Sequence, residues 1–455
     1  MKKGEGSQPD LDSEGDSNLS ESRARWHENR TELERSWLDR DAQAFLHQSL
    51  STPCLTVVES CEGAEFVDIE GRRILDFHGN YIHNLGFGHP EILQAVQEQL
   101  HTLSFSTRRY TNKPAIELAE KLGQLTNGSL SRALFAPGGA EAMSMALKIA
   151  RMVTGRHKTI SMWDSFHGAT LDTISIGGEA TFRYQAGPLL PGTEHVPPFN
   201  PSECPFECGS ACSGSCARYI DYVLEKEGDV AAVIGETIRS SPFLPHPNYW
   251  QTVRDACDRH GALLILDEIP HAFGRTGAMF THQHYGIVPD LLVVGKGLGG
   301  GVIPFAAVLA KDELNDAIKD RAIGHFTHEK SPLGSRAALA MIEVIERDEL
   351  VAGAAAKGKA AIIELKAMAE SHPWVHDVRG LGLMLGIELR NPKSGEPAKA
   401  FANDVMVRSL ELGLNFKISM GCILNWTPPL TVTSKQLSKA ISILNQALLD
   451  CQPAA

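Results

Sequence analysis

Short, continuous apolar runs recur through the middle of the chain and alternate with segments of helical periodicity. The runs cover residues 134–136, 159–162, 231–235, 262–266, 291–294 and 306–310. Apolar runs of this length, separated by helices, are typical of parallel strands that are buried on both faces. The pattern predicts an α/β core with functional groups at the carboxyl ends of its strands.

Length and charge exclude several classes of protein. The chain has 455 residues, enough for two packed domains, and its 43 Lys and Arg against 55 Asp and Glu give a net charge of −12. Such an acidic chain is a poor binder of nucleic acid or of anionic membranes. No stretch approaches the ~18 apolar residues of a membrane helix, and no apolar segment follows Met1 as in a secretory signal. We therefore expect a cytoplasmic protein.

Composition divides the chain into four segments. Residues 1–20 contain few apolar side chains among Gly, Ser, Asp and Glu, which predicts a disordered acidic tail. In residues 21–95 apolar residues return at helical spacing and a β-rich stretch follows, which predicts an N-terminal helix and part of a smaller domain. Residues 96–342 contain the apolar runs and are predicted to form the large, cofactor-binding domain. Residues 343–455 begin with long Ala-rich helices and are predicted to complete the smaller domain.

Two of the buried runs end in a charged residue. The run at 262–266 leads directly into Asp267, and the run at 291–294 leads through Gly295 to Lys296. A charge at the end of a buried strand is costly unless it is paired, so we expect both groups to face one ligand. A lysine in an apolar pocket can also lose its proton and form a Schiff base. The alternative is a plain Asp–Lys ion pair at the edge of the sheet.

A Gly-rich turn and an aromatic residue follow two further runs. Gly138 and Gly139 lie between a strand and a helix, where backbone N–H groups suit a phosphate, although such turns also serve as simple tight loops. Phe166 could stack on a planar ring, although an aromatic residue at a strand end more often packs in the core. A phosphate cradle, a stacking ring, an acid and a Schiff-base lysine match the parts of pyridoxal phosphate. The sequence therefore predicts a site for this cofactor.

Longer motifs carry a family resemblance. Residues 265–277 read ILDEIPHAFGRTG and residues 289–301 read PDLLVVGKGLGGG. Further motifs are NLGFGHP at 84–90, GGAE at 138–141, FHG at 166–168, VRGLG at 378–382 and TPPL at 427–430. With these motifs the chain resembles the class III pyridoxal-phosphate-dependent aminotransferases over roughly residues 50–450. The resemblance implies fold type I: a large domain with a mostly parallel seven-stranded sheet and a smaller α+β domain.

The resemblance also implies roles for individual residues. Lys296 resembles the lysine that binds the cofactor and moves protons during the reaction, and Asp267 resembles the partner of the pyridinium nitrogen. Thr327 resembles a threonine that reaches the cofactor phosphate from a neighbouring subunit, which implies a homodimer with shared active sites. The other residues expected at the cofactor are Gly139, Ala140, Phe166, His167 and Glu236.

Three positions depart from the family pattern. Ala140 stands where a hydroxyl residue is usual, and Pro270 stands where glutamine is usual. No arginine occurs after Arg408, although the family usually has one shortly before the TPPL segment. A transaminase must hold a keto acid, and a bidentate arginine is the usual clamp for its carboxylate. The absence of this arginine weakens the interpretation of the chain as an aminotransferase.

Within the family, the chain resembles the branch that acts on aminophosphonates and amino-phosphates. We therefore expect an ammonia-lyase that acts on a small hydroxylated aminophosphonate. In that reaction Lys296 takes the proton from C2, hydroxide leaves from C1, and hydrolysis yields phosphonoacetaldehyde and ammonia. An ω-aminotransferase on a related amine and a phospho-lyase on phosphoethanolamine are the alternatives.

Four residues are expected at the substrate. Arg108 and Arg109 lie in a segment that borders the substrate in this family and could bind a phosphonate, with a solvated basic turn as the alternative. Tyr81 belongs to the other candidate wall of the substrate site. His271 could assist departure of the hydroxyl group, although a structural histidine is as plausible.

A group of cysteines has no role in this chemistry. Cys204, Cys208, Cys212 and Cys216 recur at intervals of four residues. Four thiols can hold zinc or an iron–sulfur cluster, but structural zinc sites usually have close pairs separated by a longer loop. We expect reduced thiols and no metal, with a bound metal or a disulfide as the alternative.

Overall fold

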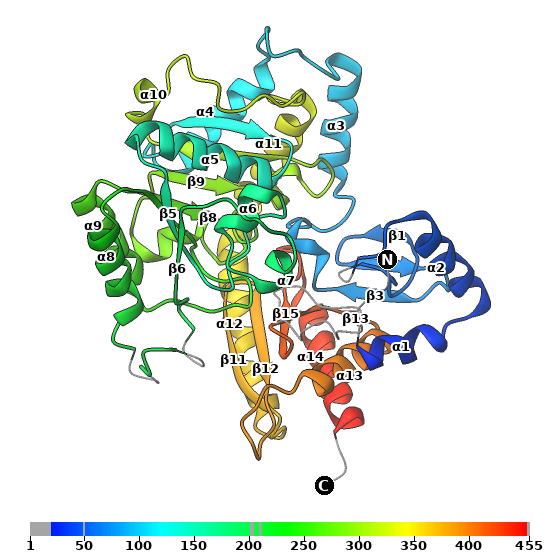
Figure 1. Ribbon diagram of the computed structural model, residues 1–455. Coiled ribbons are helices and arrows are strands. Elements are labelled where there is room, and N and C mark those ends of the chain that lie inside the picture. Colours follow the sequence, from blue (N-terminus) through cyan, green and yellow to red (C-terminus); the bar gives the residue numbers. More distant parts are fainter. Residues whose placement is uncertain (1–19, 49–50, 201–203, 209–211, 453–455) are drawn as a thin grey trace, which may run out of the picture.

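A large layered domain and a smaller domain lie side by side in the computed structural model (Figure 1). The structure describes residues 20–48, 51–200, 204–208 and 212–452. The predicted disordered tail at 1–20 therefore lies, apart from its last residue, outside the described residues. The limits predicted for the domains stay a prediction.

The large domain is built on a seven-stranded sheet with the order β4-β10-β9-β8-β7-β5-β6. The strands are β4 (Arg132–Ala136), β5 (Lys158–Met162), β6 (Thr193–Val196), β7 (Val230–Glu236), β8 (Leu263–Asp267), β9 (Leu291–Val294) and β10 (Ala306–Ala310). The six apolar runs coincide with six of these strands, and β7, β9 and β10 are buried along their whole length. The expected α/β fold with a mostly parallel seven-stranded sheet is confirmed.

One strand of this sheet runs against the others. β10 is antiparallel to both β4 and β9, whereas β5, β6, β7, β8 and β9 pair in parallel. The connection from β9 to β10 covers only residues 295–305 and contains one short 3-10 helix, η4 (Lys296–Gly299). A parallel return needs a crossover of roughly a dozen residues or more, so this short connection turns the chain back.

Helices cover the large sheet (Figure 1). α5 (Gly139–Thr154) contacts β4, β7, β8, β9 and β10, and its buried methionine and alanine side chains form one core layer with the apolar strand residues. α8 (Ser215–Glu227) and α9 (Tyr249–His260) pack against each other. The other helices of this region are α3 (Pro90–Thr102), α4 (Lys113–Leu125), α6 (Leu171–Ile176), α7 (Ala180–Arg183), η3 (Thr281–Tyr285), α10 (Leu314–Ala317) and α11 (Pro332–Arg347).

The smaller domain contains two four-stranded sheets. One has the order β1-β2-β3-β13, with strands β1 (Val58–Glu62), β2 (Glu65–Asp68), β3 (Arg73–Asp76) and β13 (Leu414–Asn415). The other has the order β11-β12-β15-β14, with strands β11 (Val375–Leu381), β12 (Met384–Leu389), β14 (Lys417–Ser419) and β15 (Ile423–Trp426). Its helices are α12 (Leu350–Ala369), α13 (Lys399–Glu411) and α14 (Ser434–Cys451).

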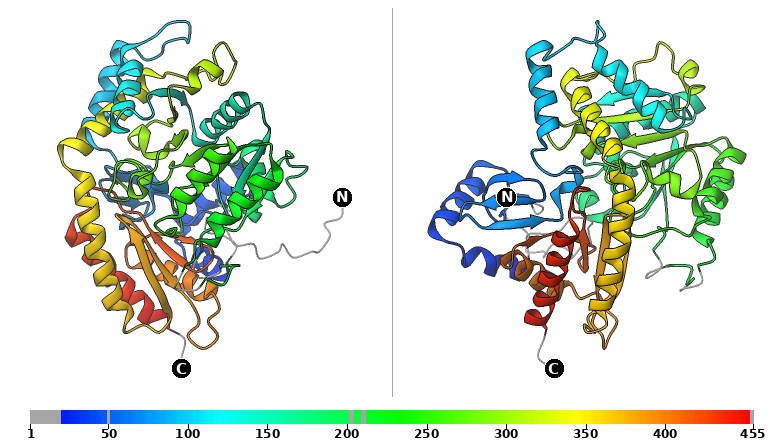
Figure 2. Two further views of the ribbon diagram at one scale, coloured as in Figure 1. Left: turned by 90° about the vertical axis from the view of Figure 1, so that its left-hand side faces the viewer. Right: turned by 180° about the vertical axis from the view of Figure 1, so that it is seen from behind.

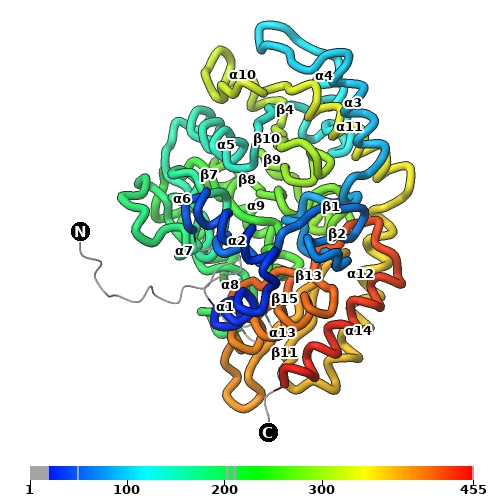
Figure 3. Tube along the Cα trace, turned by 90° about the vertical axis from the view of Figure 1, so that its right-hand side faces the viewer, coloured from blue at the N-terminus to red at the C-terminus, as the bar shows by residue number. Residues whose placement is uncertain are grey.

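The two ends of the chain meet in this smaller domain. Leu414 of β13 pairs in parallel with Leu75 of β3, so one sheet combines strands from both ends. Figures 2 and 3 show the N-terminal segment beside the C-terminal helices. A short helix η1 (Gly79–Tyr81) follows β3 and leads toward the large domain.

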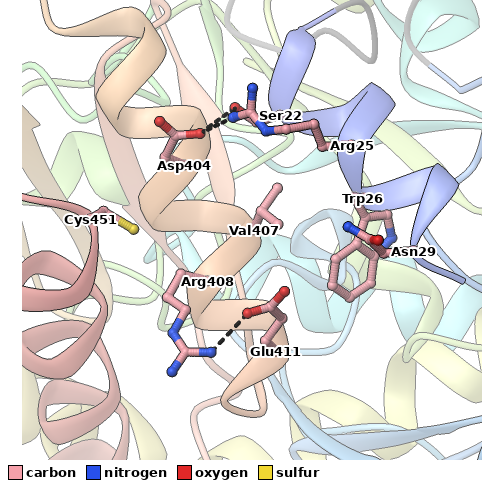
Figure 4. A pocket seen from close by; sticks show the side chains of 9 residues that line it. All are labelled: Ser22, Arg25, Trp26, Asn29, Asp404, Val407, Arg408, Glu411 and Cys451. Atoms are coloured by element: carbon pink, nitrogen blue, oxygen red, sulfur yellow. Dashed lines mark hydrogen bonds and ion pairs between the residues drawn. The ribbon is translucent and has the colours of Figure 1, made fainter.

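The N-terminal segment forms two helices, α1 (Glu21–Glu28) and α2 (Glu32–Ala44). α1 packs on α13, where Arg25 and Asp404 form an ion pair of 2.7 Å beside Trp26 (Figure 4). On α2 the side chain of Leu38 is buried, whereas Phe45 and Leu46, beyond its end, are 67% and 94% exposed. Within the described residues, the apolar side chains of this segment are therefore only partly buried.

All nine cysteines are free thiols in the structure. A hydrogen bond with Ser213 lowers the pKa of Cys208 to about 7, whereas burial raises the pKa of Cys216 to about 11. Among the described residues, no group of three or more His, Cys, Asp and Glu side chains is arranged to hold a metal ion. The helices in the described ranges are too short or too polar to cross a bilayer.

Candidate active site

A cavity of about 500 Å³ lies where the two domains meet. Its lining comes from the ends of β7 and β8, from the segments that follow β5 and β9, and from the N-terminus of α5. η1 and β14 line it from the smaller domain. Clefts at the carboxyl ends of parallel strands are the usual ligand sites of such sheets, and this volume suits a small ligand.

Asp267 is the last residue of β8 and is almost completely buried in this cavity. Its Oδ2 lies 2.8 Å from Nδ1 of His167, and its Oδ1 accepts a hydrogen bond of 3.0 Å from the backbone N–H of Ile269. These two contacts fix the orientation of the carboxylate. A carboxylate oxygen can accept more than one hydrogen bond, so Asp267 can also hold a proton on a ring nitrogen of a ligand.

Lys296 follows β9 and points its amine into the cavity. Its Nζ lies 4.6 Å from the centre of the Tyr81 ring. Lys296 has a φ of +46°, which is uncommon for a residue other than glycine. Backbone conformations of this kind cost about 1–3 kcal/mol and cluster at functional sites, because only surrounding contacts maintain them.

The N-terminus of α5 forms a narrow backbone surface in the cavity. The helix begins after Gly138, which has no side chain to cap the free N–H groups of the first turn. Gly139 and Ala140 line the cavity, and a Cβ on Gly139 would lie only 2.7 Å from Cδ1 of Ile269. The absence of a side chain at Gly139 leaves room beside Ile269, and the N–H groups of the first turn suit an anion such as a phosphate.

Aromatic and acidic side chains complete this side of the cavity. Phe166 lines it and packs against Phe182 with a ring separation of 4.7 Å. Glu236, the last residue of β7, and Glu179 are both buried and also line the cavity. Together with Asp267, three carboxylates therefore face the ligand site.

Tyr81 lines the cavity and contacts residues of the smaller domain. This residue is buried in η1 and has a φ of +63°. Its Oη accepts a hydrogen bond of 3.0 Å from Nδ2 of Asn425, and Nζ of Lys417 lies 3.5 Å from the same oxygen. Asn425 also donates to the carbonyl oxygen of Ser240. Lys417 lines the cavity and is 9% exposed.

The structure brings most of the predicted cofactor residues together. Tyr81 and seven of the eight predicted cofactor residues line the one cavity: Gly139, Ala140, Phe166, His167, Glu236, Asp267 and Lys296. The eighth, Thr327, lies exposed in the segment between α10 and α11 and is absent from this lining. The roles of all these residues stay predictions.

Three predicted substrate residues lie outside the cavity of this chain. Arg108 lies partly exposed on the surface, where it contacts the ring of His325 and forms an ion pair of 3.6 Å with Glu329. Arg109 is exposed beside it. His271 is fully buried, and its Nδ1 lies 2.9 Å from Oγ1 of Thr281. Within this chain, none of the three reaches the ligand site.

Sequence reasoning missed Lys417, Glu179 and Asn425. A signal existed for Lys417, because a lysine inside a short apolar segment is costly to bury and so suggests a function. Asn425 carries no comparable signal, since an uncharged amide before the TPPL segment does not by itself indicate a contact with Tyr81.

Glu268 follows Asp267 but serves the fold. It is completely buried and accepts hydrogen bonds from Oγ1 of Thr237 and from the backbone N–H groups of Thr281 and His282. Burial alone would raise its pKa, but His282, His271 and the hydrogen bond from the backbone of Thr281 together outweigh burial, and the pKa is lowered. Glu268 therefore anchors η3 as a carboxylate.

Comparison with known proteins gives the family. The family model described as Aminotransferase class-III matches residues 47–448. The chain belongs to this family. A class III aminotransferase has fold type I and binds pyridoxal 5′-phosphate, so both expectations are confirmed.

Three relatives illustrate the range of activities within the family. A protein of Vibrio splendidus (strain 12B01) named (R)-1-hydroxy-2-aminoethylphosphonate ammonia-lyase is 43% identical, over 96% of this chain and 95% of its own length. The acetylornithine aminotransferase of Methanocaldococcus jannaschii is 34% identical, over 92% of this chain and 99% of its own. An amine transaminase structure from an uncultivated Pseudomonas species, in its PLP-bound form, has a TM-score of 0.84 and 28% identity, over 90% of this chain and 99% of that one.

The cavity of this class III protein fits its cofactor. The close approach at Gly139 leaves backbone N–H groups for a phosphate, and the buried Asp267 offers an oxygen for the ring nitrogen. Phe166 presents a flat apolar surface for the ring, and the amine of Lys296 is the group that can react with an aldehyde. The donor set therefore has the chemistry that pyridoxal phosphate requires.

Proposed function

We propose that this protein is an ammonia-lyase that converts (R)-1-hydroxy-2-aminoethylphosphonate into phosphonoacetaldehyde and ammonia. The observation that carries the proposal is the 43% identity, over almost the whole chain, to the Vibrio splendidus protein of that name. The cavity adds support, because the described residues of its lining include no arginine to clamp a carboxylate.

The cofactor, when bound, joins the substrate amine and accepts the electrons released when a bond at the neighbouring carbon breaks. Lys296 removes the proton from C2, the carbon that carries the amine. The protonated Nζ of Lys296 then gives its proton to the hydroxyl group that leaves C1. Asp267 holds the proton on the ring nitrogen, and the backbone N–H groups of Gly139 and Ala140 bind the phosphate.

The products follow from a balanced sequence of bond changes. The C2–H bond and the C1–O bond break, a C1–C2 double bond forms, and one water leaves. The released enamine takes up a proton at C1 and loses one from nitrogen, so that the C1–C2 double bond becomes a C2–N double bond. One water then adds at C2 and the C2–N bond breaks, which releases the aldehyde and ammonia. No keto acid is consumed, and the cofactor ends in the form in which it began.

An aminotransferase is the second candidate, and the observation in its favour is the 34% identity to the acetylornithine aminotransferase of Methanocaldococcus jannaschii. Incubation of the purified enzyme with the hydroxylated aminophosphonate and no keto acid separates the candidates. Ammonia and aldehyde formed over many turnovers support the lyase. A reaction that stops after one equivalent supports the aminotransferase, and release of inorganic phosphate from phosphoethanolamine supports a phospho-lyase.

We also propose that two copies of the chain share their active sites, with Thr327 reaching the partner's cofactor phosphate. Arg108 and Asn112 contact the segment that contains Thr327, through His325 and the carbonyl oxygen of Lys330. The arginines and Thr327 therefore occupy one exposed surface of this chain. Light scattering tests the dimer, and mixing inactive Lys296→Ala with a Thr327→Ala variant of weakened cofactor affinity tests sharing, because a mixed dimer would contain one intact site.

A further inference from the structure

We propose that Lys417 is the cation that binds the phosphonate group of the substrate, with Tyr81 and Asn425 as its positioning residues. The proposal rests on the proposed function and names the phosphonate ligand inside the same cavity. Within a single chain we assign this role to Lys417 and not to Arg108 or Arg109, because neither arginine lines the cavity.

The position of Lys417 relative to Lys296 supports this assignment. The ring of Tyr81 lies near both amines, with its centre 4.6 Å from Nζ of Lys296 and 5.4 Å from Nζ of Lys417. The substrate amine takes the place of the Lys296 amine on the cofactor, and its phosphorus is three bonds from that nitrogen. A phosphonate ligand must therefore lie within a short reach of Lys296, and Lys417 is the other lysine of the described lining.

The strands hold Lys417 in place. Lys417 on β14 is paired directly with Asn425 on β15, so the two side chains start from neighbouring positions. Both reach the hydroxyl group of Tyr81, at 3.5 Å and 3.0 Å. The lysine is thus ordered before a ligand arrives, and this lowers the entropy lost on binding.

Charge balance gives a second argument. The cavity is lined by three carboxylates, Glu179, Glu236 and Asp267, whose field repels a phosphonate dianion. The positive charge of Lys417 offsets that field. An ammonium is a point charge that binds a tetrahedral oxyanion from any direction, whereas the planar guanidinium of arginine matches a flat carboxylate. A lysine here therefore favours phosphonates over carboxylates.

The test compares a charged and an uncharged ligand of equal length. The holoenzyme is titrated, through its visible absorbance and by calorimetry, with 2-aminoethylphosphonate, which has no hydroxyl group to eliminate, and with propylamine, in which a methyl group replaces the phosphonate. In Lys417→Met we expect phosphonate affinity to fall about 10- to 100-fold and propylamine affinity to stay unchanged. Lys417→Arg should recover part of the loss, and Lys393→Met, at an exposed loop lysine, is the matched control.

Kinetics supply a second readout. In Lys417→Met the KM for the hydroxylated aminophosphonate should rise more than kcat falls, because the lost contact is present in the bound substrate as well as in the transition state. A phosphonate affinity within about twofold of wild type, or an equal loss for both ligands, would overturn the assignment. If the wild type released no ammonia while the Lys417 effect persisted, the proposed lyase activity would fail and the anion site would stand.

Discussion

The two walls of the cavity are built in different ways. The cofactor wall consists of Gly139, Phe166, Asp267 and Lys296, each of which follows or ends a strand of the large sheet. The substrate wall consists of Tyr81 and Lys417, which come from opposite ends of the chain and meet through Asn425. Strand order alone places the first wall, whereas contacts between distant segments place the second. The first suits a constant reaction, and the second can vary with the substrate.

The largest expected effect comes from removing the reactive amine of the cofactor wall. Lys296→Ala should abolish the visible absorbance of the bound cofactor and lower ammonia release by about 100- to 10,000-fold or more, because a general base and a covalent anchor are lost together. Absorbance and an ammonia assay measure both. A melting temperature equal to that of the wild-type apoprotein is the control, since Lys296 is not part of the hydrophobic core. Retained turnover in Lys296→Ala would contradict the role assigned to the cofactor wall.

Asp267→Asn tests the cofactor wall with a smaller expected loss of activity. An amide cannot hold a proton on the ring nitrogen, so kcat should fall about 10- to 100-fold while KM changes little. His167 lies 2.8 Å from the carboxylate, so His167→Asn should also lower kcat, but by less than Asp267→Asn. Steady-state kinetics with the aminophosphonate measure both, and a kcat near that of wild type in Asp267→Asn would contradict the assignment.

Tyr81→Phe probes the substrate wall. The change removes the hydroxyl group that Asn425 and Lys417 contact but keeps the ring, so KM should rise about two- to tenfold. The absorbance of the bound cofactor should stay the same, because the cofactor wall is intact. A shift in that absorbance would show that the two walls are not independent.

The last prediction concerns stability rather than activity, through pH and His83, for which we expect no direct effect on turnover. Its ring is completely buried against Gly79 of η1, and burial lowers its pKa to about 4. The unfolded chain takes up this proton near pH 6.5 and the folded protein only near pH 4, so the free energy of unfolding should decrease as pH falls between those values, by up to about 3 kcal/mol. Melting temperatures of wild type and His83→Asn between pH 7 and pH 5 measure this, and equal slopes would contradict it.

The large sheet and the cofactor wall could be predicted from the sequence because both depend on local patterns. Apolar runs identified six strands, and the charges directly after two of them identified Asp267 and Lys296. β6 was missed because three of its four residues, Thr193, Glu194 and His195, are polar and not buried. The pattern also could not predict the direction of β10, since a run of apolar residues reads the same for a parallel and an antiparallel strand.

The substrate wall could not be predicted in the same way. Tyr81 and Lys417 are 336 residues apart, and their meeting depends on the pairing of β13 with β3 and of β14 with β15. The charge of Arg108 and Arg109, and the resemblance of their segment to one that borders the substrate in the family, predicted a role at the substrate, but neither shows which surface the loop faces within one chain. Their role at the substrate stays a prediction.

The pairing of β3 with β13 has a consequence for biosynthesis. The first strands of the smaller domain leave the ribosome early, but their partner at Leu414 and Asn415 is translated only near the end of the chain. The last strand of the large sheet ends at Ala310. This sheet can therefore fold before the last strands of the smaller domain have been synthesised. A truncated or stalled product could therefore contain the cofactor wall without any means of choosing its substrate.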